Sequence, residues 1–166
     1  MIDNTTNFGT YSRMLIFLIG AALLLAVDLI AKAVITGDGF TLIPGVLSII
    51  KPIRNPGAAF GMPIPLWLLV GVTIIIIAVG SFLYWKLKSC RKSKFYNIGC
   101  AFVLGGALGN LVDRILFGSV RDFLQFDFFN FPIFNFADVF LNIGMVMLVI
   151  YFIFMYKGKK RADTKS

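Results

Sequence analysis

The fold is decided by an uncharged apolar stretch, LWLLVGVTIIIIAVGSFLYW, which occupies residues 66–85. A helix needs about 20 apolar residues to cross a bilayer. Three further apolar segments approach that length, at about residues 11–34, 95–112 and 139–156. Backbone polar groups inside lipid must pair within their own segment, which favours helices. The sequence therefore predicts an all-α membrane protein with four transmembrane helices.

The composition supports this class and excludes several kinds of catalysis. Of the 166 residues, 58% are hydrophobic and 14% are charged, whereas soluble domains average roughly 45–50% and about 25%. The chain contains no His, and all eight of its acidic residues are Asp. These absences exclude a Ser-His-Asp triad, a His-ligated zinc ion and a Glu base of the HExxH type. We expect one integral membrane domain, residues 1–166, without a metal ion or cofactor.

The basic residues set the expected orientation. Two clusters carry most of them: Lys86, Lys88, Arg91, Lys92 and Lys94 between the second and third segments, and Lys157, Lys159, Lys160, Arg161 and Lys165 after the fourth. Basic loops face the cytoplasm, so both termini are predicted to be cytoplasmic. The net charge of +8 then reflects topology, and we expect no nucleic-acid partner.

The two remaining loops must lie outside the cytoplasm. The first, at about residues 35–65, is too long for a simple connection. It contains short β-prone runs at residues 40–43 and 46–50, separated by Pro44-Gly45. These runs predict a small extracytoplasmic β-structure on the membrane surface, between the first and second helices. The second loop, residues 118–135, is rich in Phe and is predicted to pack at the membrane interface.

Aspartates gather on the predicted outer side. Six of the eight are placed there by the four segments: Asp28, Asp38, Asp113, Asp122, Asp127 and Asp138. Two carboxyl groups held close in a partly dry site share a proton, so that one acts as an acid and the other as a base. Such a pair can activate water without His or a metal ion. Three of the outer aspartates are candidates for this pair: Asp113, Asp122 and Asp138.

Other polar residues lie near the outer helix ends. Asp28 and Lys32 are four residues apart, the spacing of an ion pair on one helical face. Asn110 can share a face with Asp113 and Arg114 at the end of the third helix, and the neighbouring Asp113 and Arg114 suggest a paired carboxylate. Asp138 is placed to cap the start of the fourth helix.

Five short motifs, in order along nearly the whole chain, resemble those of a known family. They are Asp28…Lys32, Asn55-x-Gly-Ala-Ala-Phe, Gly-Gly-Ala-x-Gly-Asn110-x-x-Asp113-Arg114, Val120-x-Asp122-Phe123 and Asn135-x-Ala-Asp138. Together they look like the motif set of the bacterial lipoprotein signal peptidases, or signal peptidase II. Leu29-Ile30-Ala31 departs from that pattern, in which a polar Gln and Thr are usual at these positions.

The resemblance implies an aspartic endopeptidase that removes the signal peptide from diacylglyceryl-modified prolipoproteins, just before the lipidated Cys. It implies a multi-pass protein of the bacterial cytoplasmic (inner) membrane, acting as a monomer among membrane lipids, with its active site toward the extracytoplasmic face. By position, the residues fall into three groups: catalytic Asp122 and Asp138; substrate-binding Asn55, Asn110, Arg114 and Asn135; and supporting Asp28, Lys32 and Asp113. Arg114 is expected to hold Asp113.

Two other functions remain open from the residues alone. Membrane aspartates often form ion paths, which favours a small proton-coupled transporter or channel. The uncharged interiors of the spans oppose a path across the membrane. A structural subunit that binds a partner through its outer loops is the other alternative.

Overall fold

The computed structural model describes residues 4–57 and 62–156, and the side chains of residues 12–57 and 62–154. Four helices dominate it: α1 Asn4–Val34, α2 Leu66–Lys86, α3 Lys94–Phe117 and α4 Phe136–Ile150, the last continuing into a π-helical turn, η3 Tyr151–Tyr156. Each of the first three contains a segment that is long and apolar enough to cross a membrane, and α4 does so together with the start of η3. The prediction of an all-α membrane protein with four spanning helices is confirmed.

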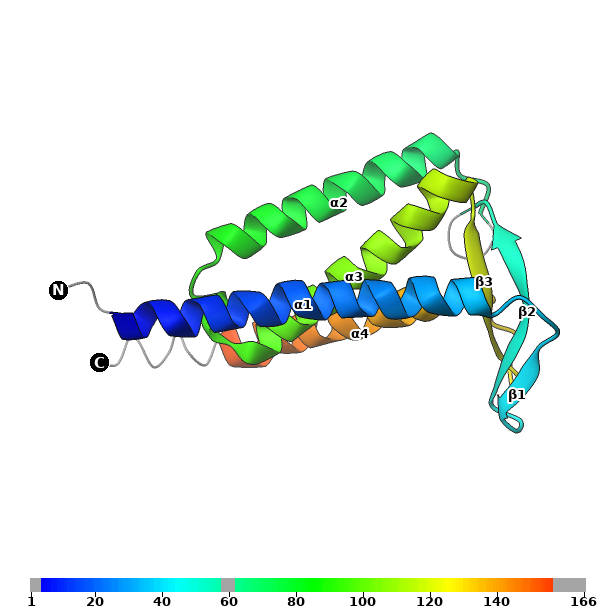
Figure 1. The fold of residues 1–166 in the computed structure, drawn as a ribbon, viewed down its shortest axis with the longest axis horizontal. Helices are drawn as coiled ribbons and strands as arrows, with labels where there is room; N and C mark the ends of the chain where they lie inside the picture. Colours follow the sequence, from blue (N-terminus) through cyan, green and yellow to red (C-terminus); the bar gives the residue numbers. More distant parts are fainter. Residues whose placement is uncertain (1–3, 58–61, 157–166) are drawn as a thin grey trace.

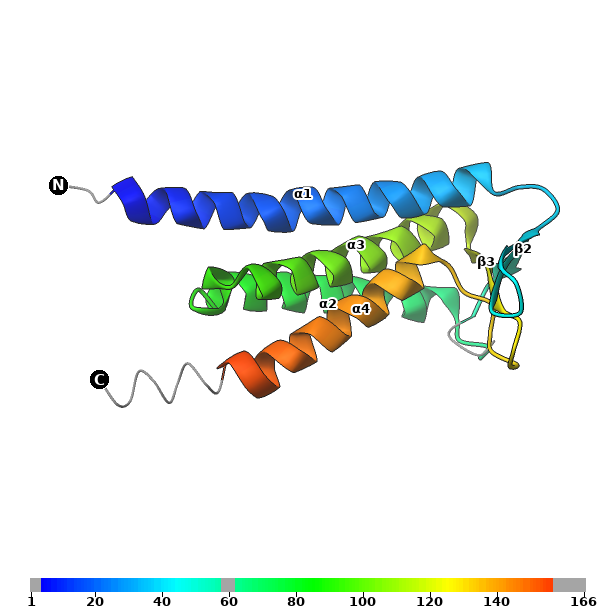
Figure 2. The same ribbon diagram turned by 90° about the horizontal axis from the view of Figure 1, so that it is seen from below.

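Helix α3 is the centre of the bundle. It packs along α1 on one side and α4 on the other, whereas α2 is splayed away from both (Figures 1 and 2). Small residues permit the close approach of α3 to its neighbours. A Cβ atom on Gly105 would collide with Leu24 of α1, and one on Gly106 would collide with Leu141 of α4. The glycine-rich part of the third segment is therefore a packing surface.

An antiparallel sheet lies across one end of the bundle (Figure 1). Its strands are β1 Phe40–Ile43, β2 Leu47–Asn55 and β3 Val120–Phe126, in that spatial order. Gly45, with a φ of 71°, makes the turn between β1 and β2. The small sheet from the first outer loop was predicted. Strand β3 was not, because its partner β2 is far away in the sequence and its own residues do not alternate in burial.

Helix α3 is longer than the sequence indicated. It was expected to end near residue 112, but it continues to Phe117. Gly118, with a φ of 69°, ends it in the left-handed conformation that glycine adopts without strain. As a result Asp113 and Arg114 lie within the last turns of α3, beside the sheet.

The opposite end of the bundle holds both described ends of the chain and the α2–α3 connection (Figure 1). That connection contains the short helix η2 Cys90–Lys92 and carries the first basic cluster. The second basic cluster and the Ala58–Gly61 part of the Asn55 motif lie outside the described residues. Two apolar cores divide the molecule: Phe17, Tyr84, Tyr96 and Tyr151 pack at this end, and Ala31, Ile49, Phe123 and Leu124 pack under the sheet.

Candidate active site

Two of the three candidate aspartates face one cavity at the sheet end of the bundle. Asp122 comes from β3, and Asp138 comes from the first turn of α4. The cavity has a volume of about 400 Å³. Its polar lining consists of Asn55, Asn110, Arg114, Asp122, Asp138 and Asn142, and most of its remaining wall is apolar. The sheet and the bundle therefore bring together residues that are distant in the sequence.

Asn135 connects the two carboxylates. Its amide nitrogen donates to Asp122 Oδ1 at 2.6 Å, and its backbone N–H donates to Asp138 Oδ2 at 3.2 Å. Its amide oxygen accepts from the backbone N–H of Asp138 at 3.1 Å, which completes a capping box at the start of α4. The carboxylate of Asp138 accepts from a free N–H group at the start of the helix, as predicted, but the N-cap residue is Asn135. Asn135 is fully buried, so it fixes the two carboxyl groups relative to each other.

Asn55 fixes the second oxygen of Asp122. Its amide nitrogen donates to Asp122 Oδ2 at 3.0 Å. The backbone N–H of Gly57 donates to the amide oxygen of Asn55 at 3.1 Å, which sets the orientation of the amide. Strand β2 pairs Asn55 with Val120 and Ile53 with Asp122. The sheet register therefore places this donor beside the carboxylate.

Asn110 performs the same task for Asp138. Its amide nitrogen donates to Asp138 Oδ1 at 2.7 Å, while its amide oxygen accepts from Lys32 Nζ at 3.1 Å. An ammonium group can only donate, so Lys32 decides which end of the amide faces the carboxylate. Lys32 is buried and forms an ion pair with Asp28 at 2.8 Å. The predicted ion pair on the first helix is confirmed, and it orients Asn110.

Asp28 also anchors α4. Its Oδ1 accepts from the backbone N–H of Ala137 at 2.9 Å, in the first turn of that helix. A carboxylate at this position satisfies a free N–H group and interacts favourably with the helix dipole. A Cβ atom on Gly109 would collide with this carboxylate. Gly109 is therefore required for Asp28 to reach between α3 and α4.

The third candidate, Asp113, is committed to a different contact. Arg121 donates to it from its backbone N–H at 3.0 Å, from Nε at 3.2 Å and from Nη2 at 2.7 Å. Lys32 Nζ lies 3.7 Å from the same carboxylate. The expectation that Arg114 holds Asp113 is wrong, because neighbouring helix residues point in different directions and the facing cation is on β3. The pair positions the strand residue just before Asp122.

Arg114 instead lines the cavity with the two aspartates. Its guanidinium group is half-buried and is within electrostatic range of Asp122 and Asp138. It makes no hydrogen bond or ion pair with other side chains in the described part of the chain. Of the four residues predicted to bind substrate, Arg114 therefore has the most donors available to a ligand. Asn55, Asn110 and Asn135 each donate to an aspartate.

The surroundings of Asp122 favour a proton on its carboxyl group. Burial raises the pKa of Asp122 above its ordinary value, while the amide donors of Asn55 and Asn135 lower it by a smaller amount. The charges of Asp122 and Asp138 also interact with each other. Two such carboxyl groups can hold one proton between them, which provides both an acid and a base. Among the described residues, no cluster of acidic or Cys side chains is suited to hold a metal ion.

Two residues of the site were not singled out in the sequence. Arg121 neighbours Asp122, and successive strand residues point to opposite faces; that alternation could have indicated a supporting role for it. Asn142 lies one helical turn after Asp138, lines the cavity and donates to the carbonyl oxygen of Asp138 at 2.9 Å. The sequence could have indicated Asn142, because it is a polar residue one helical turn after Asp138 within an otherwise apolar span.

The Phe-rich loop closes part of the cavity. Phe126, Phe131 and Phe134 line it, and their rings pack against one another with centroid distances between 5.0 and 5.9 Å. Phe128 and Phe129 belong to the same cluster and are exposed. The loop therefore forms an apolar wall beside the aspartates.

Solved structures define the class of this molecule. One described as a bacterial membrane enzyme matches with a TM-score of 0.73 and 32% identity, covering 82% of this chain and 87% of that chain. Another with the same description matches with a TM-score of 0.72 and 32% identity, covering 83% and 92%. The fold is thus that of a multi-pass membrane enzyme, and two carboxylates face its cavity.

Sequence comparisons give the family. A family model described as signal peptidase (SPase) II matches residues 20–154. A lipoprotein signal peptidase of Enterococcus faecalis is 37% identical over 152 residues, covering 89% of this chain and 93% of that protein. One from Staphylococcus aureus is 34% identical over 164 residues, covering 90% and 98%. The chain belongs to the signal peptidase II family, as its motifs predicted, and these relatives do not support the transporter hypothesis.

Proposed function

We propose that this protein is an aspartic endopeptidase that removes the signal peptide from diacylglyceryl-modified prolipoproteins, cleaving just before the lipidated Cys. Membership of the signal peptidase II family supports the reaction and its substrate class. The observation that carries the catalytic assignment is the joint presentation of Asp122 and Asp138 to one cavity, with Asn135 hydrogen-bonded to both.

The reaction requires one proton shared by the two carboxyl groups. The ionised aspartate takes a proton from a water molecule, and the resulting hydroxide attacks the scissile carbonyl carbon. The protonated aspartate gives its proton to the carbonyl oxygen as the tetrahedral intermediate forms. A proton then passes from the pair to the leaving amide nitrogen and the C–N bond breaks. One hydroxyl group of the intermediate returns its proton to the pair as the new carboxyl group forms, so the pair again holds one proton.

The amides around the pair hold it ready for this exchange. Asn55 and Asn135 donate to Asp122, and Asn110 donates to Asp138. Fixed donors stabilise an ionised carboxylate without further reorganisation during the reaction. These amides are thus positioning residues. Arg114 supplies free donors in the same cavity, suited to peptide carbonyl groups or to the ester oxygens of the substrate's lipid.

The location of the cavity suits a lipid-linked substrate. It lies where the first turns of α4 and the last turns of α3 meet the sheet, at one end of the spanning segments. Val139 and Ile143 of α4 form its wall on the membrane side, and the Phe-rich loop forms another wall. A signal helix within the bilayer can therefore present a bond at the membrane boundary.

The proposed topology follows from the basic residues. The basic α2–α3 connection and both described ends of the chain are opposite the sheet (Figure 1), which supports cytoplasmic termini and an extracytoplasmic active site. We place this single-domain protein in the bacterial cytoplasmic membrane as a monomer surrounded by lipid. A catalytic pair within one chain is consistent with activity as a monomer.

Substitution of either aspartate tests the assignment. Asp122→Asn and Asp138→Asn should each lower kcat for cleavage of a lipidated prolipoprotein in detergent by at least roughly 10²–10⁴-fold, the usual contribution of acid–base groups. Asp127→Asn is the matched control, because Asp127 is an exposed outer aspartate that accepts from Ser48 outside the cavity. Full activity of either pair variant in folded protein would refute the assignment.

A further inference from the structure

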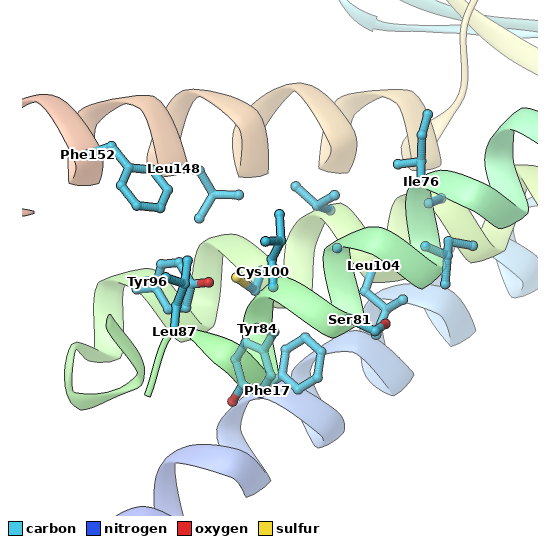
Figure 3. Close-up of a pocket in the computed structure, with 15 residues that line it drawn as sticks. Phe17, Ile76, Ser81, Tyr84, Leu87, Tyr96, Cys100, Leu104, Leu148 and Phe152 are labelled. Atoms are coloured by element: carbon cyan, nitrogen blue, oxygen red, sulfur yellow. The ribbon is translucent and has the colours of Figure 1, made fainter. Parts of the chain in front are cut away.

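A second cavity, distinct from the candidate active site, lies at the opposite end of the bundle. This apolar slot is lined by all four helices, as Figure 3 shows: Phe17 from α1, Tyr84 from α2, Tyr96 and Cys100 from α3, and Leu148 from α4. Its volume is about 170 Å³. In Figure 1, α2 stands apart from α1 and α4 over much of its length.

The slot is long and narrow. Its α3 wall extends from Tyr96 to Ala107, a rise of about 16 Å along a helix. Its volume is nevertheless less than half of the 400 Å³ of the active-site cavity. A helix with its side chains is about 10 Å wide, which is too wide for so small a space. An extended hydrocarbon chain fits these dimensions.

The slot opens toward the bilayer. Among its lining residues, Ile76 is 55% exposed, Leu83 is 44% exposed and Phe152 is 38% exposed. These side chains belong to spanning segments, so the medium outside is hydrocarbon. Lipid chains can therefore enter sideways between α2 and α4.

One end of the slot is strongly basic. Leu87, which lines it, lies in the first basic cluster, Lys86, Lys88, Arg91, Lys92 and Lys94. No acidic residue occurs between Asp38 and Asp113. The Arg91 guanidinium lies 5.5 Å from the ring centroid of Tyr84, itself part of the slot wall. The Nε atom of Arg91 is buried and has no hydrogen-bond partner among the described residues.

We propose that the slot binds one acyl chain of an anionic phospholipid of the cytoplasmic leaflet, with its headgroup at Arg91 and the neighbouring lysines. Apolar walls select the hydrocarbon chain, and the uncompensated positive charge selects a phosphate-bearing, net-negative headgroup. The half-buried guanidinium group of Arg91 can donate to such a headgroup. The named leaflet depends on the proposed topology, whereas the site itself does not depend on the peptidase assignment.

Photo-crosslinking with a phosphatidylglycerol that carries a diazirine on one acyl chain tests the proposal. The full chain is reconstituted in lipid nanodiscs, and crosslinked peptides are located by mass spectrometry. Crosslinks are expected on the α3 and α4 residues of the slot. The matching phosphatidylcholine probe should label them about fivefold less, the effect of about one headgroup–arginine interaction.

Two glycines of α2 supply a matched pair of variants. A Cβ atom on Gly80 or on Gly71 would meet nothing within 4 Å, but only Gly80 lines the slot. Leu also has a higher helix propensity than Gly, so neither substitution should disturb α2. Gly80→Leu should abolish crosslinking within the slot, and Gly71→Leu should leave it unchanged. Arg91→Gln should remove the preference for phosphatidylglycerol, whereas Lys51→Gln, an exposed cation on β2, should not.

Two results would overturn the proposal. One is equal labelling by the two probes, and the other is undiminished labelling of Gly80→Leu. Failure of the peptidase assignment would appear separately, as full cleavage by Asp122→Asn.

Discussion

The two ends of the bundle bury polar groups in different ways. At the sheet end, Asp28, Lys32 and Asp113 are each at most 1% exposed and are joined by ion pairs. At the opposite end, stacked rings surround one buried amide: Asn97 accepts from Tyr84 and donates to the carbonyl oxygens of Arg91 and Ser93. Ion pairs orient groups around the proposed catalytic pair at one end, whereas stacked rings join the helices at the other.

This contrast has a physical basis. A buried ion pair contributes little net stability compared with apolar packing, but removing one partner is expensive. Buried ion pairs are nevertheless found at the sheet end, because each carboxylate and amide there must keep one orientation. At the opposite, basic end no side chain needs such a fixed orientation, so stacked rings and the amide of Asn97 are enough to hold the helices together.

Among variants at the two ends, Lys32→Met should have the largest effect on stability and activity. The substitution leaves Asp28 and Asp113 with less compensation and frees the amide of Asn110 to rotate. We expect the free energy of unfolding to fall by about 3–5 kcal/mol, as for other broken buried pairs. Thermal unfolding in detergent and kcat measured below the transition provide the readouts.

Lys51→Met is the control for that variant, because Lys51 is an exposed cation in β2. It should change neither quantity. Wild-type stability together with wild-type kcat in Lys32→Met would show that the charged network does not orient the site.

At the opposite end, Tyr84→Phe should affect stability alone. The phenol donates to Asn97 Oδ1 at 2.8 Å, and its loss leaves a buried acceptor unpaired. The expected cost is about 1–3 kcal/mol in the free energy of unfolding. The kcat of the folded variant should be unchanged, since the contact is remote from the active-site cavity. A matching loss of kcat would mean that the two ends are coupled.

Asn55→Ala should change the pH dependence of the reaction. Asn55 lowers the pKa of Asp122, which burial raises. Removing the donor raises this pKa further, so the basic limb of the kcat profile, where the pair loses its shared proton, should move to higher pH. The free energy of unfolding should also fall by a larger amount as the pH rises from the unfolded-state pKa to the raised folded-state pKa, because the folded state keeps the proton to a higher pH.

Ser48→Ala is the matched control for Asn55→Ala. It removes a hydrogen bond from the same strand, β2, to a different aspartate, Asp127. Its pH profile should equal that of the wild type. An unshifted basic limb in Asn55→Ala would show that Asp122 does not carry the proton that controls the rate.

The smallest effect is expected from Asn142→Leu. Asn142 lines the membrane side of the active-site cavity and donates to the carbonyl oxygen of Asp138. Loss of one neutral hydrogen bond to substrate, about 1 kcal/mol, corresponds to about a fivefold rise in KM with kcat nearly constant. Thr73→Val on α2, where the hydroxyl also bonds its own helix, is the control. An unchanged KM would exclude contact between Asn142 and the substrate.

Much of the fold could be predicted because hydrophobic runs act locally. The stretch at residues 66–85 became α2 at nearly the expected bounds, and residues 40–43 became β1. Strand β3 was missed because a strand partner far along the sequence leaves no local pattern. The end of α3 was placed too early because the charges of Asp113 and Arg114 suggested a membrane boundary, whereas Asp113 is buried and Arg114 faces the cavity.

By itself, the sequence determined the class of protein, its four spans and the aspartates available for catalysis, because composition and hydrophobic length act without knowledge of contacts. Only the tertiary structure decided how those aspartates are used. Asp113 faces Arg121 and is neutralised, while Asp122 and Asp138 face a cavity and share Asn135. The reason is geometric: a carboxylate's chemistry depends on which donors lie within about 3 Å of it, and the donors here come from strands and helices that only folding brings together.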